Sequence, residues 1–155
     1  MQKNTLVAWG IIIISFAGIL NAGYLTMQHF IGFPIECNVL NGCEVVTASA
    51  YSAILGIPIA LFGLLFYIAY FVAGMSIRER YNERLVTLMW YAVSIAFVIS
   101  IILTLIQALI LKAFCQYCVF SALEITALFV LTLLLRKQGS INIESSNGKE
   151  ISEIQ

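Results

Sequence analysis

Residues 114–120 read FCQYCVF, so two cysteines three positions apart stand between two apolar runs that are each long enough to cross a bilayer. A strongly hydrophobic chain has few polar side chains with which to do chemistry. A Cys-x-x-Cys pair at this junction is therefore the first candidate for a reactive site. The flanking runs indicate the class of protein, and their order decides on which side of a membrane the pair lies.

The amino-acid composition is that of a membrane protein. Hydrophobic residues make up 61% of the 155 positions and charged residues 10%, against about 45–50% and about 25% in soluble domains. Four apolar stretches reach the length of a membrane span without Lys or Arg in their middle, at 6–27, 57–75, 85–111 and 114–135. The sequence predicts an all-α fold, an integral membrane four-helix bundle over residues 1–137, and we expect a monomer.

Several function classes are excluded by what the chain lacks. It has a single histidine, His29, and no aspartate, so it cannot contain a Ser/His/Asp triad. It has no GxGxxG or GxxxxGK[ST] motif for phosphate. The net charge is zero and no basic patch suggests nucleic-acid binding.

The basic residues predict the orientation in the membrane, because they are enriched in cytoplasmic loops. Only Lys112 flanks the spans on one side, and six basic residues flank them on the other: Lys3, Arg78, Arg80, Arg84, Arg136 and Lys137. We therefore expect a multi-pass protein of the plasma or inner membrane with both termini in the cytoplasm. A cleavable signal peptide is an alternative interpretation of the first apolar run. The polar tail, residues 138–155, is predicted to be disordered.

This orientation places all four cysteines on the external, oxidising face, where cysteine pairs persist as disulfides. Cys115 and Cys118 lie at positions i and i+3 at the start of the fourth span, where the helix N-terminus favours a thiolate. Cys37 and Cys43 lie in the one long connection, residues 28–56, in which 43–55 can form a short surface helix. A loop pair beside a helix-anchored pair suggests a relay by thiol–disulfide exchange.

Two other interpretations of the four cysteines stay open at this point. They can form two static structural disulfides, although a Cys-x-x-Cys disulfide closes a small, strained ring and rarely has a structural role. They can also hold a tetrahedral zinc ion, although this spacing is unfavourable and we predict no metal. Glu124, an ionisable residue inside the fourth span, is a functional candidate by its position. At about 100° per residue it points away from Cys118 and toward a neighbouring helix, where it is expected to be protonated and hydrogen-bonded.

Taken together, these motifs resemble the vitamin K epoxide reductase family in its prokaryotic, single-domain form. The resemblance rests on Cys37-x5-Cys43, on Ser49 six residues later, on GIPIALFG at 56–63 and on CQYC at 115–118. It covers nearly the whole apolar part of the chain, and the order, spacing and topology of the motifs agree.

The resemblance implies a bundle around a quinone of the ubiquinone or menaquinone type, with the external loop and its short helix capping the pocket. It implies that Cys118 reacts with the quinone, that Cys43 exchanges with Cys115, and that Cys37 meets the partner. It places Ser49 at the quinone. The partner would be a separate thioredoxin-like, DsbA-like protein, since no such domain is fused to this chain.

Two departures from the animal members bear on the substrate. Those proteins have Asn where this chain has Ile59 and Tyr where it has Ala122, and both side chains contact the vitamin there. Their absence argues against vitamin K epoxide and leaves the hydrogen-bond donors to the quinone unidentified. A DsbB-like oxidase with the same net reaction is the nearest alternative, although its cysteine pairs come in the reverse order. A membrane scaffold with structural disulfides is the non-catalytic alternative.

Overall fold

The computed structural model describes residues 2–31, 45–46, 49, 52–54 and 56–153. Long helices dominate this part of the chain: α1 (Gln2–Ile31), α3 (Ile59–Glu79), α4 (Glu83–Leu105) with its π-helical extension η1 (Ile106–Leu111), and α5 (Gln116–Glu153). Four segments of them are long and apolar enough to cross a membrane: Thr5–Ile31, Ile59–Glu79, Glu83–Leu111 and Gln116–Lys137. The predicted all-α bundle with four spans is confirmed.

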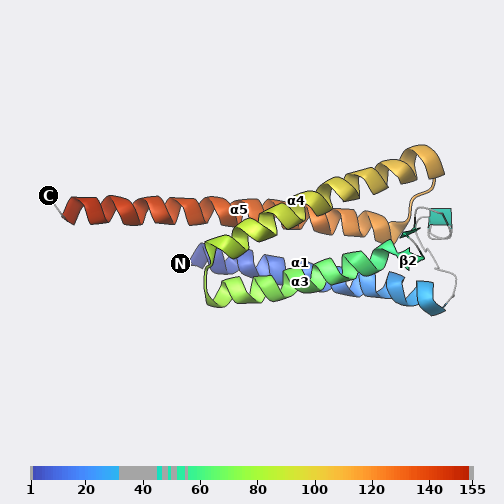
Figure 1. Ribbon diagram of the computed structural model, residues 1–155, viewed down its shortest axis with the longest axis horizontal. Helices are drawn as coiled ribbons and strands as arrows, with labels where there is room; N and C mark the ends of the chain where they lie inside the picture. The colour runs from blue at the N-terminus through green and yellow to red at the C-terminus, as the bar shows by residue number, and fades with distance from the viewer. Residues whose placement is uncertain (1, 32–44, 47–48, 50–51, 55, 154–155) are drawn as a thin grey trace.

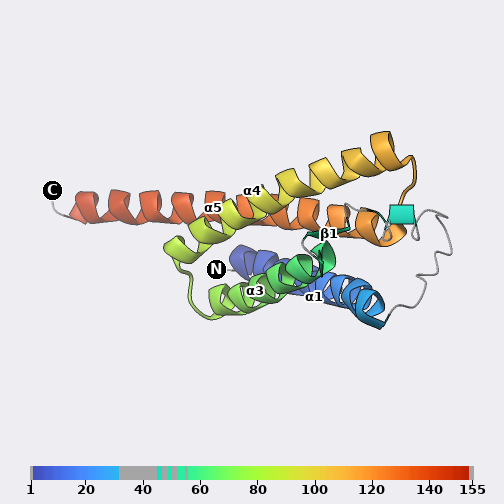
Figure 2. The ribbon, with the colours of Figure 1, turned by 45° about the vertical axis from the view of Figure 1, so that its right-hand side comes forward.

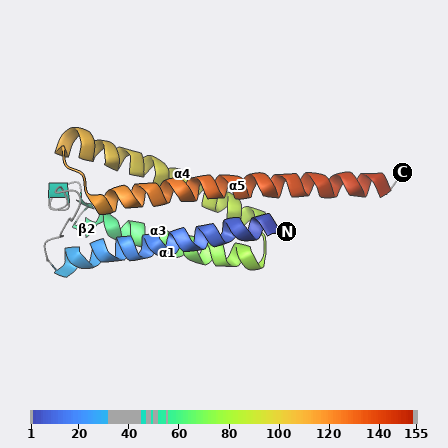
Figure 3. The ribbon, with the colours of Figure 1, turned by 180° about the vertical axis from the view of Figure 1, so that it is seen from behind.

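The four helices run alternately in opposite directions along the bundle (Figure 1). α1 packs along α3 and α5, and α4 packs along α5, whereas α3 and α4 make few contacts with each other. In Figures 1, 2 and 3 the separation between α4 and α3 widens toward the end where α4 passes into η1. The cavity described below is lined by residues of both helices at this end of the bundle.

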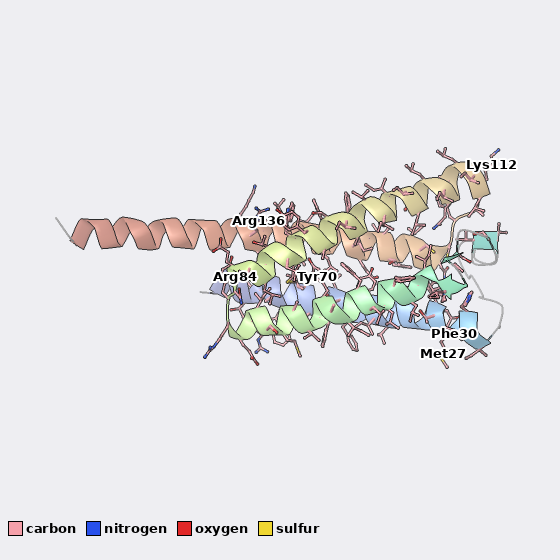
Figure 4. All side chains as sticks on the ribbon, in the orientation of Figure 1. Met27, Phe30, Tyr70, Arg84, Lys112 and Arg136 are labelled. Carbon is pink, nitrogen blue, oxygen red and sulfur yellow. The ribbon has the colours of Figure 1, made fainter. Side chains whose placement is uncertain are left out.

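Figure 4 shows that the two ends of the bundle differ in charge. Arg84 and Arg136 lie at the end with the α3–α4 turn, which we call the basic end, and Lys112 lies at the opposite end. At the basic end the guanidinium of Arg78 stacks 4.5 Å from the Trp9 ring centroid, and Arg136 lies 5.6 Å from that of Trp90. Such Arg–Trp pairs suit a membrane interface, where an apolar ring and a charged group meet.

The helix boundaries follow from particular residues. Asn82 caps α4, since its side-chain oxygen accepts hydrogen bonds from the backbone N–H groups of Arg84 and Leu85. Pro58 precedes the first residue of α3 at φ −63°, where its missing N–H costs nothing. Lys112 ends η1 in the left-handed region at φ 48°, which turns the chain toward α5.

A small β-hairpin lies before α3 and was not predicted. Strand β1 (Ala53–Ile54) pairs antiparallel with β2 (Ile57–Pro58), and Gly56 makes the turn at φ +82°. The surface helix predicted over 43–55 therefore does not extend to its expected end. Of that segment the structure describes only Val45 and Val46 as helical. The glycine, which allows a positive φ, explains why the chain turns back here.

Beyond the bundle, α5 continues as helix to Glu153 and projects past the other helices (Figure 1). The disorder that the sequence predicts for the tail, residues 138–155, stays a prediction. Proline, which would end a helix, does not occur in this segment.

The bundle core is closed around Tyr67 of α3, whose side chain is 0% exposed. Gly18 of α1 faces its ring so closely that a Cβ added there would overlap the ring carbons. The tyrosine cannot easily swing aside, because its hydroxyl is hydrogen-bonded to Ser121 of α5. The contact between α1 and α3 at this level therefore depends on glycine.

We expect Gly18→Ala to destabilise the folded protein by about 1–3 kcal/mol, the usual cost of overpacking a closed core. The midpoint of unfolding in mixed micelles measures this. Gly23→Ala on the same helix is the matched control. A Cβ at Gly23 meets only Leu64 at 3.8 Å, which is ordinary contact. An equal effect of both substitutions would contradict the prediction.

Candidate functional site

The Cys-x-x-Cys motif lies at the first turn of α5. The helix begins at Gln116, and the N–H of Val119 donates to the carbonyl of Cys115 at 3.0 Å. Cys115 therefore occupies the capping position before the helix, and Cys118 is the third helical residue. Both are free thiols in this structure. The expected placement of the pair at the start of the fourth span is confirmed.

This position stabilises the Cys115 thiolate. A hydrogen bond from the Cys118 thiol lowers the pKa of Cys115, and backbone N–H groups of Cys118 and Tyr117 lower it further. Burial raises the pKa and offsets part of this effect, leaving it at about 7. The sulfur of Cys115 thus takes the place of the side-chain oxygen that normally caps a helix.

We expect Cys115 to ionise with a midpoint near pH 7. The ultraviolet absorbance of the thiolate, taken as the difference between the protein and its Cys115→Ser variant, follows this titration and does not need a reagent to reach the buried sulfur. Cys118→Ala removes the strongest hydrogen bond to the thiolate, so the midpoint should move to higher pH. Cys118→Ser, which keeps a donor, should move it less. An unshifted midpoint in Cys118→Ala would contradict this assignment.

Gln107 of η1 ties the motif to the preceding helix. Its side chain is buried at 6% exposure, and its Oε1 accepts the N–H of Cys115 at 3.2 Å. Its carbonyl accepts from Ala113 and Lys112, and its side chain also hydrogen-bonds to Cys118. A helix cap is normally supported by a Glu or Gln two or three residues into the same helix. Here a residue from the neighbouring π-helical turn has that role.

A cavity of about 800 Å³ lies inside the bundle next to the motif. Residues of α1, α3, α4, η1 and α5 line it together with Val46, Ser49 and Ser52. Most of the wall is apolar, and polar side chains reach it at a few points, among them Asn21, Gln107 and Ser121. Size and polarity suit a small, mostly apolar ligand with a few hydrogen-bonding groups.

The two described cysteines face different surroundings. Cys118 forms part of the cavity wall, whereas Cys115 does not. Cys115 is 0% exposed and packs against Val46, which belongs to the segment before the hairpin. Cys118 therefore borders the space in which a ligand can lie, whereas Cys115 packs against Val46 outside that wall.

The remaining candidates from the sequence have different outcomes. Cys37 and Cys43 lie outside the residues that the structure describes. Ser49 lies in the cavity wall, but its hydroxyl donates to the carbonyl of Val46 at 2.6 Å. Ser49 is therefore placed to accept a hydrogen bond from a ligand and not to donate one while this contact holds.

Glu124 lies behind the cavity wall in a cluster of polar side chains. Its carboxylate accepts a hydrogen bond from Asn21 Nδ2 at 3.4 Å, and Tyr67 lies beside it. Asn21 also donates to the carbonyl of Tyr117 at 3.1 Å, and Tyr67 Oη lies 2.9 Å from Ser121 Oγ. Glu124 thus faces neighbouring helices, as its angular position predicts.

Sequence reasoning missed Gln107, Asn21, Ser121 and Tyr67 as site residues. The available signal was an amide or hydroxyl inside a span, where polar groups are costly and tend to be functional. Tyr67 carries no such signal, since a tyrosine inside a span can equally well pack as an apolar residue.

A comparison with models of known protein families matches residues 9–133 to the vitamin K epoxide reductase family. A search of curated proteins finds no significant match.

Proposed function

The chain belongs to the vitamin K epoxide reductase family, whose members are quinone-dependent, disulfide-forming oxidoreductases, and from this premise we propose that it reoxidises a thioredoxin-like partner by a cysteine relay. Electrons pass from the partner to Cys37 and Cys43, then to Cys115 and Cys118, and then to a quinone. The observation that carries this proposal is the placement of Cys118 in the wall of the cavity while Cys115 packs against Val46.

The cavity supports the binding of a quinone. Its apolar wall suits a substituted ring, and the weak contact between α3 and α4 leaves a path for a lipid-soluble tail toward the membrane. A quinone supplies the driving force, since it accepts two electrons and two protons. Gln107 and Ser121 bring an amide and a hydroxyl to the cavity wall, where they are available to orient the quinone oxygens, and Ser49 can accept a hydrogen bond from a quinol hydroxyl.

The first half of the relay proceeds by thiol–disulfide exchange. A partner thiolate attacks Cys37 of the Cys37–Cys43 disulfide, and the partner leaves oxidised after its second thiolate resolves the mixed disulfide. Cys43 then attacks Cys115 of the Cys115–Cys118 disulfide, and Cys118 departs as a thiolate at the cavity. Cys37 resolves the Cys43–Cys115 mixed disulfide by attacking Cys43, which restores the Cys37–Cys43 disulfide and releases Cys115 as a thiolate. The proximity of Val46 to Cys115 supports the exchange between Cys43 and Cys115. Cys43 precedes Val46 by three residues, which span at most about 10–11 Å.

The second half regenerates the disulfide. Cys118, facing the cavity, passes the electron pair to the bound quinone, and the Cys115 thiolate closes the disulfide with the Cys118 sulfur. The low pKa of Cys115 suits this role, because a thiolate is the attacking species. Two thiols are oxidised to one disulfide, and one quinone is reduced to quinol.

We further propose that the cysteine end of the bundle faces the outside of the cell and the basic end faces the cytoplasm. The support is the enrichment of Arg at one end of the bundle, with Lys112 at the other (Figure 4). On this orientation the partner is a separate, secreted DsbA-like protein, and the quinone is the ubiquinone or menaquinone of the same membrane. The protein acts as a monomer.

Anaerobic titration of the purified protein tests the proposal. A reduced thioredoxin-like dithiol and a short-chain ubiquinone analogue are added together, and quinol formation is followed by absorbance. We expect one quinone consumed per partner disulfide formed. Disulfide formation without quinone consumption would overturn the proposal, and so would no turnover with either a ubiquinone or a menaquinone analogue. The scaffold alternative predicts that neither reactant is consumed.

A further inference from the structure

Polar side chains from three helices lie together behind the cavity wall. Asn21 of α1 donates to Glu124 of α5 at 3.4 Å, and Glu124 lies beside Tyr67 of α3. The Tyr67 hydroxyl lies 2.9 Å from Ser121 Oγ of α5 and also donates to the Ser121 carbonyl at 3.2 Å. Ser121 lies in the cavity wall together with Cys118, three residues before it on the same helix face. Glu124 does not line the cavity. The series Glu124, Tyr67 and Ser121 therefore leads from the bundle interior to the place where we propose that the quinone binds.

The proton balance of the proposed reaction needs such a donor. Quinol formation takes up two protons, but a pair consisting of a Cys115 thiolate and a Cys118 thiol carries only one. The second proton must come from elsewhere at the moment of reduction. The thiolate at Cys115 thus creates a requirement that the cysteines alone cannot meet.

We propose that Glu124, as a neutral carboxylic acid, supplies this second proton through the hydroxyls of Tyr67 and Ser121. The inference rests on the proposed function. Glu124 gives its proton to Tyr67 as Tyr67 passes one to Ser121 and Ser121 passes one to the quinone oxygen. The carboxylate regains a proton when the next electron pair arrives, because the partner brings two thiol protons and only one remains on the Cys115/Cys118 pair.

The contacts are compatible with this direction of transfer. Either Tyr67 or Ser121 can be the donor in their 2.9 Å hydrogen bond. Two hydroxyls in series can therefore both donate toward the cavity. A hydroxyl transfers a proton without net change, since it accepts one as it releases another. Each link in the series is thus able to pass a proton on.

The surroundings of Glu124 favour the neutral acid. The groups beside it are Asn21 from α1 and Tyr67 from α3, both of them uncharged. Among the described residues the carboxylate makes no ion pair with a cation that would stabilise its charge. An unpaired carboxylate inside a membrane span is costly. The titratable sulfurs of the motif lie further along the chain: Cys118 is six residues before Glu124 on α5, and Cys115 is nine residues before it, at the cap of that helix.

Asn21 has a second role in the same arrangement. Its Nδ2 donates hydrogen bonds to the Tyr117 carbonyl and to the Glu124 carboxylate. Its Oδ1 is buried without a hydrogen-bond partner in the structure. A buried acceptor with no donor is costly. The hydroxyl of a quinol in the cavity is a donor of the right kind, since Asn21 also lines the cavity wall.

The experiment compares variants of the full chain carrying Cys37→Ser and Cys43→Ser, so that the Cys115/Cys118 pair is the only dithiol. The protein is reduced, freed of reductant and mixed with a short-chain ubiquinone analogue for a single turnover. Glu124→Gln, Tyr67→Phe and Ser121→Ala each interrupt the series, and Ser121→Thr restores its hydroxyl. The matched controls are Tyr70→Phe and Thr132→Val. They break an equivalent 2.8 Å hydrogen bond between the same helices, away from the cavity.

We expect each interrupting variant to slow quinone reduction on the order of 10²-fold, the lower part of the range for general acid catalysis. The deficit should widen as pH rises, because the proton must then come from water, and the solvent deuterium isotope effect should change. Ser121→Thr and the two controls should keep the wild-type rate. Reoxidation of the reduced pair by a soluble disulfide, which needs no quinone proton, should be equally fast in all variants.

The outcomes separate the two proposals. If the parent with intact Glu124 does not reduce the quinone, the proposed function fails. If the parent does and Glu124→Gln matches it in rate, pH profile and isotope effect, only the proton path is overturned. A pH-independent loss shared by Tyr70→Phe and Thr132→Val would show a structural role for the cluster and would also overturn it.

Discussion

Quinone reduction falls by roughly 10³-fold or more when Cys118 is replaced by serine, because the variant lacks the sulfur that the structure presents to the cavity. The hydroxyl of serine is a far weaker nucleophile than a thiolate and cannot form a disulfide with Cys115. The expected loss is in the rate of turnover and not in quinone affinity, since serine keeps the shape of the cavity wall. Steady-state quinol formation with a reduced thioredoxin-like dithiol measures both quantities.

The same variant should accumulate a mixed disulfide between Cys43 and Cys115. In Cys118→Ser the Cys115 sulfur remains, and its thiolate attacks the Cys37–Cys43 disulfide to release Cys37 as a thiolate. No Cys118 sulfur is then present to resolve the bond. Peptide mapping under non-reducing conditions identifies the crosslinked pair.

Cys115→Ser is the control for this prediction. It should also lose quinone reduction, because the disulfide cannot close, but it should give no crosslink to Cys43. A crosslink between Cys43 and Cys118 in that variant, with none in Cys118→Ser, would reverse the roles of the two sulfurs and contradict the relay.

The position of the reactive pair could be predicted from the sequence because it depends on local rules. A Cys-x-x-Cys motif at the start of an apolar run is at a helix N-terminus whatever the tertiary structure, and α5 indeed begins at Gln116. The four spans could be predicted for the same reason, because an apolar segment of this length in a bilayer forms a helix that satisfies its own backbone hydrogen bonds. The direction in which Glu124 points follows from helix geometry alone.

Gln107 and Tyr67 could not be assigned in this way. The contact of Gln107 with Cys115 spans eight residues and needs the π-helical turn and the left-handed Lys112, neither of which produces a hydrophobic period. The contact of Tyr67 with Ser121 spans 54 residues and depends on how α3 packs against α5. Residues 53–58 were misassigned because two strands of two residues are too short to show a period-two pattern.

The cavity itself depends on small residues of α4, and this leads to a second large effect. Ala92, Ala96 and Ser100 recur every four residues, so they lie on one face of the helix, and all three line the cavity. Their short side chains leave the space that we propose the quinone ring fills. Ala96→Trp should therefore abolish quinone binding by filling this space.

We expect the apparent affinity for a short-chain ubiquinone analogue to fall at least about 100-fold in Ala96→Trp, which is about 2.8 kcal/mol at 1.4 kcal/mol per tenfold change. Exchange between the partner dithiol and the cysteines should stay at the wild-type rate, because Ala96 is far along the chain from them and touches none of the steps at Cys115. Stopped-flow quinone reduction and partner oxidation, measured on the same preparation, give the two rates separately.

Val98→Trp is the matched control, since Val98 lies two residues further on α4, is 55% exposed on the outer surface and does not line the cavity. Tryptophan there meets lipid and should leave quinone reduction unchanged. The prediction would be contradicted if the Ala96→Trp variant bound the quinone with the same affinity as the Val98→Trp variant. The quinone ring would then have to bind outside this cavity, and the placement of Cys118 in the cavity wall would no longer explain its reactivity. If both variants lost partner exchange as well, the substitution on α4 would be acting through folding, which the unfolding midpoint in mixed micelles detects.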